Sequence, residues 1–136
     1  MIERSDGIID DVPIPFFPLL AETYPTAKFI LTQRDKASWL ASMKTHWGGK
    51  KNPDDPDLLA FRLALRHEVY GCTAFDRDVL SERFDRHHRA VDAFFAACPG
   101  RLLRLNLIER NGWPPLCEFL GCPPVDHPFP WLGRAR

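Results

Sequence analysis

The stretch that decides the fold occupies residues 27–35 and reads Ala-Lys-Phe-Ile-Leu-Thr-Gln-Arg-Asp. Residues 27–33 form a short, nearly continuous run of β-branched and aromatic side chains, which is typical of a strand covered on both faces. Asp35 is a suitable N-cap, and an apolar stripe continues at helical spacing along residues 39–47. We therefore expect a buried parallel strand that turns directly into a helix at Arg34 and Asp35.

The rest of the chain alternates between predicted helices and strands. Further helices are expected at residues 16–24, 58–70, 78–98 and 113–120, and further short strands at 7–10 and 101–107. Strands separated by helices pair in parallel through right-handed crossovers, so the predicted fold class is α/β. Three strands are fewer than the usual sheet of about five or six. The expected architecture is therefore an incomplete three-layer sandwich, with a short parallel sheet flanked by helices.

Composition predicts one soluble globular domain across residues 1–136. Hydrophobic residues make up 45% of the chain and charged residues 26%, which excludes a disordered tail, a fibre and a coiled coil. Lys plus Arg and Asp plus Glu both number 18, so no bulk positive field exists for nucleic acid or an anionic membrane. The sequence offers neither an apolar membrane-spanning run nor a signal-peptide pattern in residues 1–20, and a cytoplasmic protein is expected.

Prolines and cysteines add expectations about loops and thiols. The 13 prolines cluster in connections, which predicts a mobile loop at residues 48–57 and an extended tail at 122–136. The four cysteines lie in apolar or helix-end contexts and are expected to be reduced and mostly buried. No Cys/His pairs occur at metal-ligand spacing, so no metal site is expected. Packing is the expected role of Trp47, Trp113 and Trp131, and structural hydrogen bonding that of His87 and His88.

Arg34 and Ser42 are the candidate anion-binding residues. Ligands of open parallel sheets bind beyond the carboxyl ends of the strands, which is where Arg34 is expected. A guanidinium holds a phosphate through two parallel charge-assisted bonds, and a hydroxyl two turns along the following helix adds a third contact. On spacing alone, the alternative is that Arg34 pairs with Asp35 or another acid and that Ser42 is an incidental helix serine.

A wider pattern resembles the sulfotransferases that use 3′-phosphoadenosine 5′-phosphosulfate. Residues 24–35, continuing through Trp39 to Ser42 and Met43, resemble the segment that binds the 3′-phosphate of this co-substrate. Further matches lie in order along nearly the whole chain, at Asp11-Val12-Pro13, Phe84-Asp85-Arg86-His87, Leu102-Leu103, Gly112-Trp113, Phe119-Leu120-Gly121 and Pro128-Phe129-Pro130. In that family an arginine at the strand end and a serine eight positions later grip the 3′-phosphate. The resemblance thus implies that Arg34 and Ser42 do so here.

Two departures from the family pattern qualify what the resemblance implies. The family opens with a strand and a glycine-rich loop that holds the 5′-phosphosulfate, and the eight glycines here form no such run. By the resemblance, the chain corresponds to the C-terminal two thirds of a sulfotransferase domain, with little or no turnover alone. Many members place a histidine as general base before the 3′-phosphate strand, but residues 1–28 contain none. Asp11 is the nearest carboxylate at a comparable place, and its alternative role is to cap a turn before Pro13.

The leading hypothesis is therefore sulfuryl transfer to a hydroxyl or amine of a small molecule or glycan, without a metal. Asp11 would serve as the base, and Arg34 and Ser42 as the 3′-phosphate ligands. The alternative is a noncatalytic fragment or interaction module whose open sheet edge is covered by a second copy or a partner chain. A nucleotide kinase is disfavoured because no lysine accompanies a glycine loop.

Overall fold

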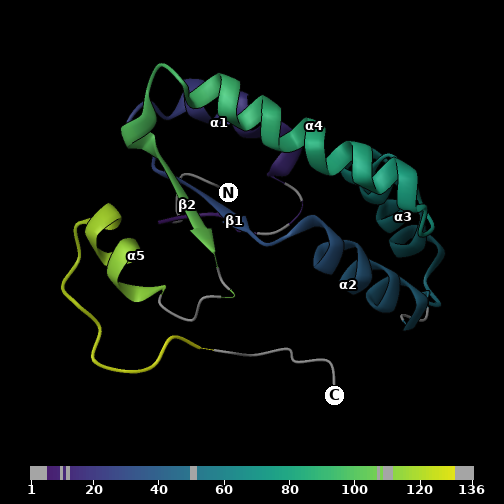
Figure 1. Cartoon of the computed structure of the whole chain (residues 1–136). Coiled ribbons are helices and arrows are strands. Elements are labelled where there is room, and N and C mark those ends of the chain that lie inside the picture. The colour runs from purple at the N-terminus through teal and green to yellow at the C-terminus, as the bar shows by residue number, and fades with distance from the viewer. Residues whose placement is uncertain are drawn as a thin grey trace. The chain divides into compact units, whose positions relative to one another are not determined.

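The computed structural model is an α/β structure, and it describes residues 6–9, 11, 13–49, 52–106, 108 and 112–130. The elements of this part, shown in Figure 1, are α1 (Phe17–Thr23), β1 (Phe29–Gln33), α2 (Lys36–Gly49), α3 (Pro56–Tyr70), α4 (Arg77–Phe95), β2 (Leu102–Asn106) and α5 (Trp113–Leu120). Short 3-10 turns at Ile14–Phe16 and Pro99–Arg101 precede α1 and β2. The chain divides into two compact units, residues 1–25 with 36–94, and residues 26–35 with 95–136.

Capping residues fix where the helices of the first unit begin and end. The Asp55 carboxylate accepts hydrogen bonds from the backbone N–H groups of Asp57 and Leu58, at 2.8 and 3.1 Å, and so starts α3. Asp76 starts α4 in the same way, with bonds of 3.0 and 3.1 Å. Gly71 ends α3 in the left-handed conformation, with φ of 80°. These contacts are local, so the sequence alone encodes these boundaries.

The core of the first unit is built from aliphatic and aromatic side chains of its four helices. Leu80 is fully buried, and the other buried apolar residues of this unit are Ala21, Leu40, Val69 and Val91. The Trp39 ring joins α2 to α4 through Phe84, with ring centroids 5.1 Å apart. An ion pair adds to this contact, because Lys36 Nζ lies 2.8 and 3.0 Å from the two Asp85 carboxylate oxygens. Helix α2 is thereby fastened to α4 at its first turn.

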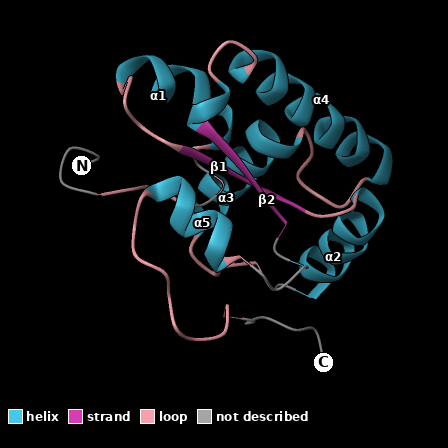
Figure 2. Ribbon diagram, turned by 60° about the vertical axis from the view of Figure 1, so that its left-hand side comes forward, coloured by secondary structure: helices cyan, strands magenta, loops and turns pink. Residues whose placement is uncertain are grey.

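The second unit contains the sheet. Strands β1 and β2 pair in parallel, with Phe29 opposite Leu102 and Gln33 opposite Asn106, and Figure 2 shows them side by side. Helix α5 packs against β2. The Phe29 ring lies 5.1 Å from that of Phe95, and Arg101 Nε donates a 3.1 Å hydrogen bond to the Ala27 carbonyl. The predicted parallel pairing of β1 and β2 is confirmed.

Several boundaries differ from the sequence expectations. Residues 7–9 have no regular secondary structure, so the predicted strand there is wrong, and Asp10 lies outside the described residues. Helix α4 ends at Phe95 rather than Cys98, where the Cys98 N–H bonds to the Phe95 carbonyl at 3.0 Å ahead of Pro99. Helix α2 continues through residue 49. In the connection between α2 and α3, the described residues without helix or strand are 52–55. Residues 122–130 lack helix and strand, as expected, and 131–136 lie outside the described part.

The prediction that β1 is covered on both faces is also wrong. Ile30 is 42% exposed, and Thr32 on the same face is exposed as well. A parallel strand is buried when it has neighbouring strands on both sides and helices on both faces. In the described part of the chain β1 pairs with β2 alone. Its amino-acid composition is therefore that of a central strand, whereas its pairing in this part of the chain is that of an edge strand.

Candidate functional site

Asp11 lines a polar pocket in the first unit. Its backbone carbonyl oxygen accepts a 3.1 Å hydrogen bond from the Ile14 N–H, and this backbone turn leaves the alternative role of the side chain, as a cap before Pro13, a prediction. The pocket has a volume of about 160 Å³. Its other lining residues come from α2 and α3 and are His46, Trp47, Arg62, Leu65, Arg66 and Tyr70. Asp11 thus contributes to the pocket wall, while its action as a base stays a prediction.

Helix α3 supplies most of the pocket wall. Arg62, Leu65 and Arg66 have the spacing of side chains that share one helix face, and Tyr70 follows one turn later. The sequence interpretation missed Arg62 and Arg66. The signal for them was the pair of arginines one turn apart on a helix whose other face carries apolar residues.

Two contacts fix the Arg66 guanidinium within this wall. Its central carbon lies 4.6 Å from the centroid of the Trp47 ring, in a cation–π arrangement. Arg66 Nη1 also donates a 3.2 Å hydrogen bond to the Thr73 carbonyl. The Trp47 ring is held in turn by an edge contact with Tyr70, with centroids 5.4 Å apart. Because a guanidinium carries five N–H donors, Arg66 keeps donors beyond the one that bonds to Thr73.

Charged side chains contribute to the pocket wall. Its described lining residues include two guanidinium groups, of Arg62 and Arg66, and the Asp11 carboxylate. Arg62, Arg66 and Asp11 are all half-buried, so solvent screens their charges less than it would on the open surface.

Arg34 and Ser42 are both exposed, and they belong to different units. Arg34 directly follows β1 in the second unit, as expected for the carboxyl end of a strand. Ser42 lies in the middle of α2 in the first unit. That both residues bind one phosphate stays a prediction.

The Lys36–Asp85 ion pair holds the first turn of α2, and the hydrogen bond from Lys36 keeps the pKa of Asp85 below its usual value.

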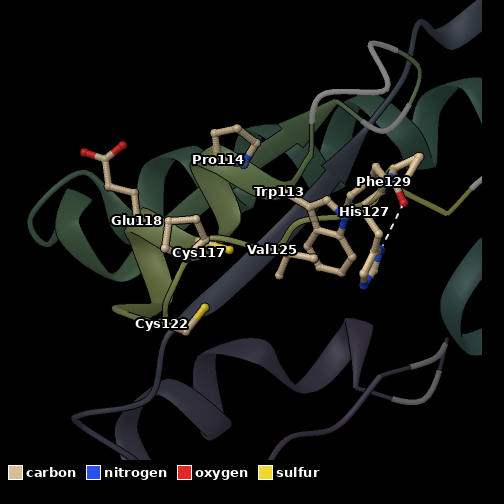
Figure 3. Close-up of a pocket in the computed structure, with 10 residues that line it drawn as sticks. Trp113, Pro114, Cys117, Glu118, Cys122, Val125, His127 and Phe129 are labelled. Atoms are coloured by element: carbon tan, nitrogen blue, oxygen red, sulfur yellow. Dashed lines mark hydrogen bonds between the residues drawn. The ribbon is translucent and has the colours of Figure 1, made fainter.

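A larger, mostly apolar pocket of about 530 Å³ lies in the second unit, between α5 and the segment that follows it. In Figure 3, Cys117 and Cys122 lie at one end of this pocket and Trp113, His127 and Phe129 at the other. The Trp113 and Phe129 rings meet edge to face, with centroids 4.9 Å apart. These contacts confirm the expected packing role of Trp113, as those with Tyr70 and Arg66 do for Trp47. Trp131 lies outside the described residues.

The cysteines of this pocket are poor candidates for chemistry. Burial raises the pKa of the Cys117 thiol, and the neighbouring Cys122 thiol raises it further. The thiolate is the reactive and metal-binding form, so Cys117 is held in its inert state. Only Cys117 of the four free cysteines is buried, and Cys122 is exposed, which corrects the expectation that most are buried. No group of three His, Cys, Asp or Glu side chains suited to a metal occurs in the described part of the chain.

The histidines of α4 have structural surroundings. His88 Nδ1 lies 2.9 Å from the Phe84 carbonyl oxygen, which confirms the expected hydrogen bond. Both rings are half-buried. Burial lowers the pKa of His87, and the nearby charge of His88 lowers it further. The His87 ring meets Phe17 edge to face, with centroids 6.0 Å apart, which places it in the packing between α1 and α4.

Comparison with known proteins gives matches along the whole chain. The family described as Sulfotransferase domain matches residues 1–136. The chain is also similar to "Ava biosynthesis cluster protein M" from Aspergillus versicolor, with 30% identity over 148 aligned residues that cover 97% of this chain and 55% of that protein. The chain thus spans about half the length of this curated relative. Within the described residues, no helix has the length and apolar character needed to cross a membrane.

Proposed function

Because this chain belongs to the sulfotransferase family, we propose that it transfers a sulfuryl group from 3′-phosphoadenosine 5′-phosphosulfate to a hydroxyl or amine of a small molecule or glycan. The family implies this co-substrate and suggests a small-molecule acceptor. The name of the relative assigns that protein to a biosynthesis cluster, which is consistent with a small acceptor. The observation that carries the proposal is the family match over residues 1–136. The polar pocket beside Asp11 supports it.

The roles of the residues follow from their chemistry. Arg34 would hold the 3′-phosphate through paired N–H donors, and the Ser42 hydroxyl would add a further contact. The acceptor oxygen forms a bond to sulfur while the bond between sulfur and the phosphate oxygen of the co-substrate breaks. Adenosine 3′,5′-bisphosphate leaves, and the acceptor proton passes to the Asp11 carboxylate. The protein contributes in-line positioning and neutralisation of charge on the leaving phosphate.

We also infer that this chain turns over weakly by itself. The 5′-phosphosulfate needs its own set of donors, and the eight glycines form no phosphate-binding loop that would supply backbone N–H groups. A chain that binds the 3′-phosphate but lacks donors for the leaving phosphate loses the electrostatic stabilisation that drives the reaction. Binding of the bisphosphate product is therefore a better first measurement than turnover.

The test is a calorimetric titration of adenosine 3′,5′-bisphosphate into the wild-type chain and an Arg34→Ala variant. Hydrogen bonds to charged groups contribute about 1.5–3 kcal/mol each, so loss of Arg34 should weaken binding at least about tenfold. Ser42→Ala should cost about 1 kcal/mol, a loss of a few-fold. Arg89→Ala, at an exposed arginine on α4, is the matched control and should bind as wild type does. Equal binding by wild type and Arg34→Ala removes Arg34 from the site.

The second candidate function is an interaction module, and the exposed face of β1 favours it. Ile30 is 42% exposed on a strand of otherwise apolar composition, which is the kind of surface that a second copy or a partner chain covers. Light scattering across a concentration series is the measurement. Assembly that Ile30→Lys abolishes would support this role, whereas a monomer at all concentrations would exclude self-association.

A further inference from the structure

We propose that Cys117 and Cys122 form a redox-active pair, which a small disulfide of the glutathione class oxidises to an intrachain disulfide bond. This modification site goes beyond the proposed function, because it uses none of the residues assigned to sulfuryl transfer. Neither thiol is a candidate for that transfer or for a metal site. Oxidation has other requirements, namely one accessible thiol and a second sulfur atom within its reach.

The end of α5 brings the two cysteines together. Gly121 follows the helix with φ of 74°, and its N–H donates a 3.3 Å hydrogen bond to the Glu118 carbonyl. The Cys122 N–H donates a 3.0 Å hydrogen bond to the Cys117 carbonyl. These two bonds define the Schellman motif, in which the side chains at the positions of Cys117 and Cys122 frequently contact each other. The local fold of the helix end therefore pairs the two thiols.

The backbone geometry permits a disulfide between these residues. Such a bond closes without backbone movement only when the two Cα atoms lie within about 7 Å of each other. The 3.0 Å hydrogen bond between the Cys122 N–H and the Cys117 carbonyl, together with standard backbone bond lengths, keeps the two Cα atoms within this limit. A hydrogen bond between the two thiols contributes to the raised pKa of Cys117, so the sulfur atoms are also neighbours. In Figure 3 both side chains lie at the same end of the apolar pocket.

Exposure sets the order of the two exchange steps, because Cys122 is exposed and Cys117 is buried. The Cys122 thiol loses its proton, and the thiolate forms a bond to one sulfur of the small disulfide while the other sulfur leaves as a thiolate. Cys117 then loses its proton and attacks the Cys122 sulfur, which breaks the mixed disulfide and releases the second small thiolate. The two departing thiolates take up the two protons. Two cysteines are thereby oxidised, and one small disulfide is reduced to two thiols.

The raised pKa of Cys117 slows the second step without preventing it. It lowers the fraction of thiolate, which is the attacking form. The Cys122 sulfur is already a neighbour, however, so the attack is intramolecular and needs no encounter with a second molecule. Closure of the bridge should therefore outcompete accumulation of the mixed disulfide.

The test is intact-mass spectrometry of the whole chain after incubation with oxidised glutathione and alkylation of the remaining thiols in denaturant. The untreated chain has four free cysteines and should take up four alkyl groups. We expect the treated chain to take up two, to carry no glutathione, and to regain all four sites after reduction with dithiothreitol. Cleavage after Glu118 separates the two cysteines, so the bridge should hold the two fragments together until it is reduced. Four unchanged thiols, a disulfide between two chains, or a mixed disulfide that does not close would each overturn the proposal.

Variants assign the bridge to these two thiols. Cys117→Ala should stop the exchange at the first step and retain one glutathione on Cys122, whereas Cys122→Ser should lose no thiol pair. Cys98→Ser is the matched control, at a half-buried cysteine before β2, and should form the bridge as wild type does. Because Cys117 is buried, circular dichroism checks the fold of its variant, and the exposed Cys122 gives a reading independent of core packing. Loss of two thiols in Cys122→Ser would refute the assignment.

Discussion

The turn between α3 and α4 depends on a glycine that no other residue replaces without cost. Gly71 has φ of 80°, where a side chain is strained, and a Cβ added there would lie 2.7 Å from Arg83 Nε and 3.2 Å from Val79 Cγ1. Left-handed backbone costs a non-glycine residue about 1–2 kcal/mol, while the stiffer unfolded chain returns about 0.4–1 kcal/mol. Crowding adds about 1 kcal/mol, because the Arg83 side chain is flexible and can move aside while Val79 must shift slightly. We expect Gly71→Ala to lower the free energy of unfolding by about 1–3 kcal/mol.

Gly121 supplies a matched control for the backbone part of this cost. Its φ is 74°, and an added Cβ would meet no atom within 4 Å. Gly121→Ala therefore pays the conformational strain without the crowding and should cost about 1 kcal/mol or less. Urea unfolding followed by far-ultraviolet circular dichroism measures both variants.

The crowding itself is isolated by a double-mutant cycle with Arg83→Ala. This change removes the nearest atoms, Nε at 2.7 Å and Cγ at 3.4 Å, and leaves Val79 in place. The loss caused by Gly71→Ala should shrink by about 0.5–1 kcal/mol in the Arg83→Ala background, at the lower end of the range seen for residues in contact. Equal losses in the two backgrounds, or a Gly71→Ala loss no larger than that of Gly121→Ala, would refute the reasoning.

Three further predictions concern the first unit. Leu80→Ala, at the one fully buried large side chain of the described residues, should lower the free energy of unfolding by about 2–5 kcal/mol in urea titrations. Asp55→Ala should cost about 1 kcal/mol in the same assay, and Asp55→Asn should restore most of it, because asparagine also caps helices. The pKa of His87 is lowered in the fold, so stability should fall as the pH drops from the ordinary histidine value of about 6.5 toward the lower folded value. Replacement by Gln should remove that part of the pH dependence of the unfolding midpoint.

The C-terminal ends of α3 and α5 were predicted well from the sequence, unlike that of α4. Helix α5 occupies residues 113–120, as predicted, because Pro114 lies at its start and Gly121 adopts the left-handed conformation at its end. Helix α3 ends at residue 70 for the same reason, with Gly71 as its cap. Such capping signals act between residues close in sequence, so every group involved can be identified from the sequence alone.

Burial and pocket walls were predicted less well because they depend on residues distant in sequence. The apolar composition of β1 predicted cover on both faces, but how many neighbours a strand has is set by the whole sheet. Asp11 was singled out by its place before Pro13, and the pocket around it was not foreseen. Arg62 and Arg66 could not be assigned to a pocket from the sequence, because the pocket forms only where α2 and α3 place Trp47 and Tyr70 beside them.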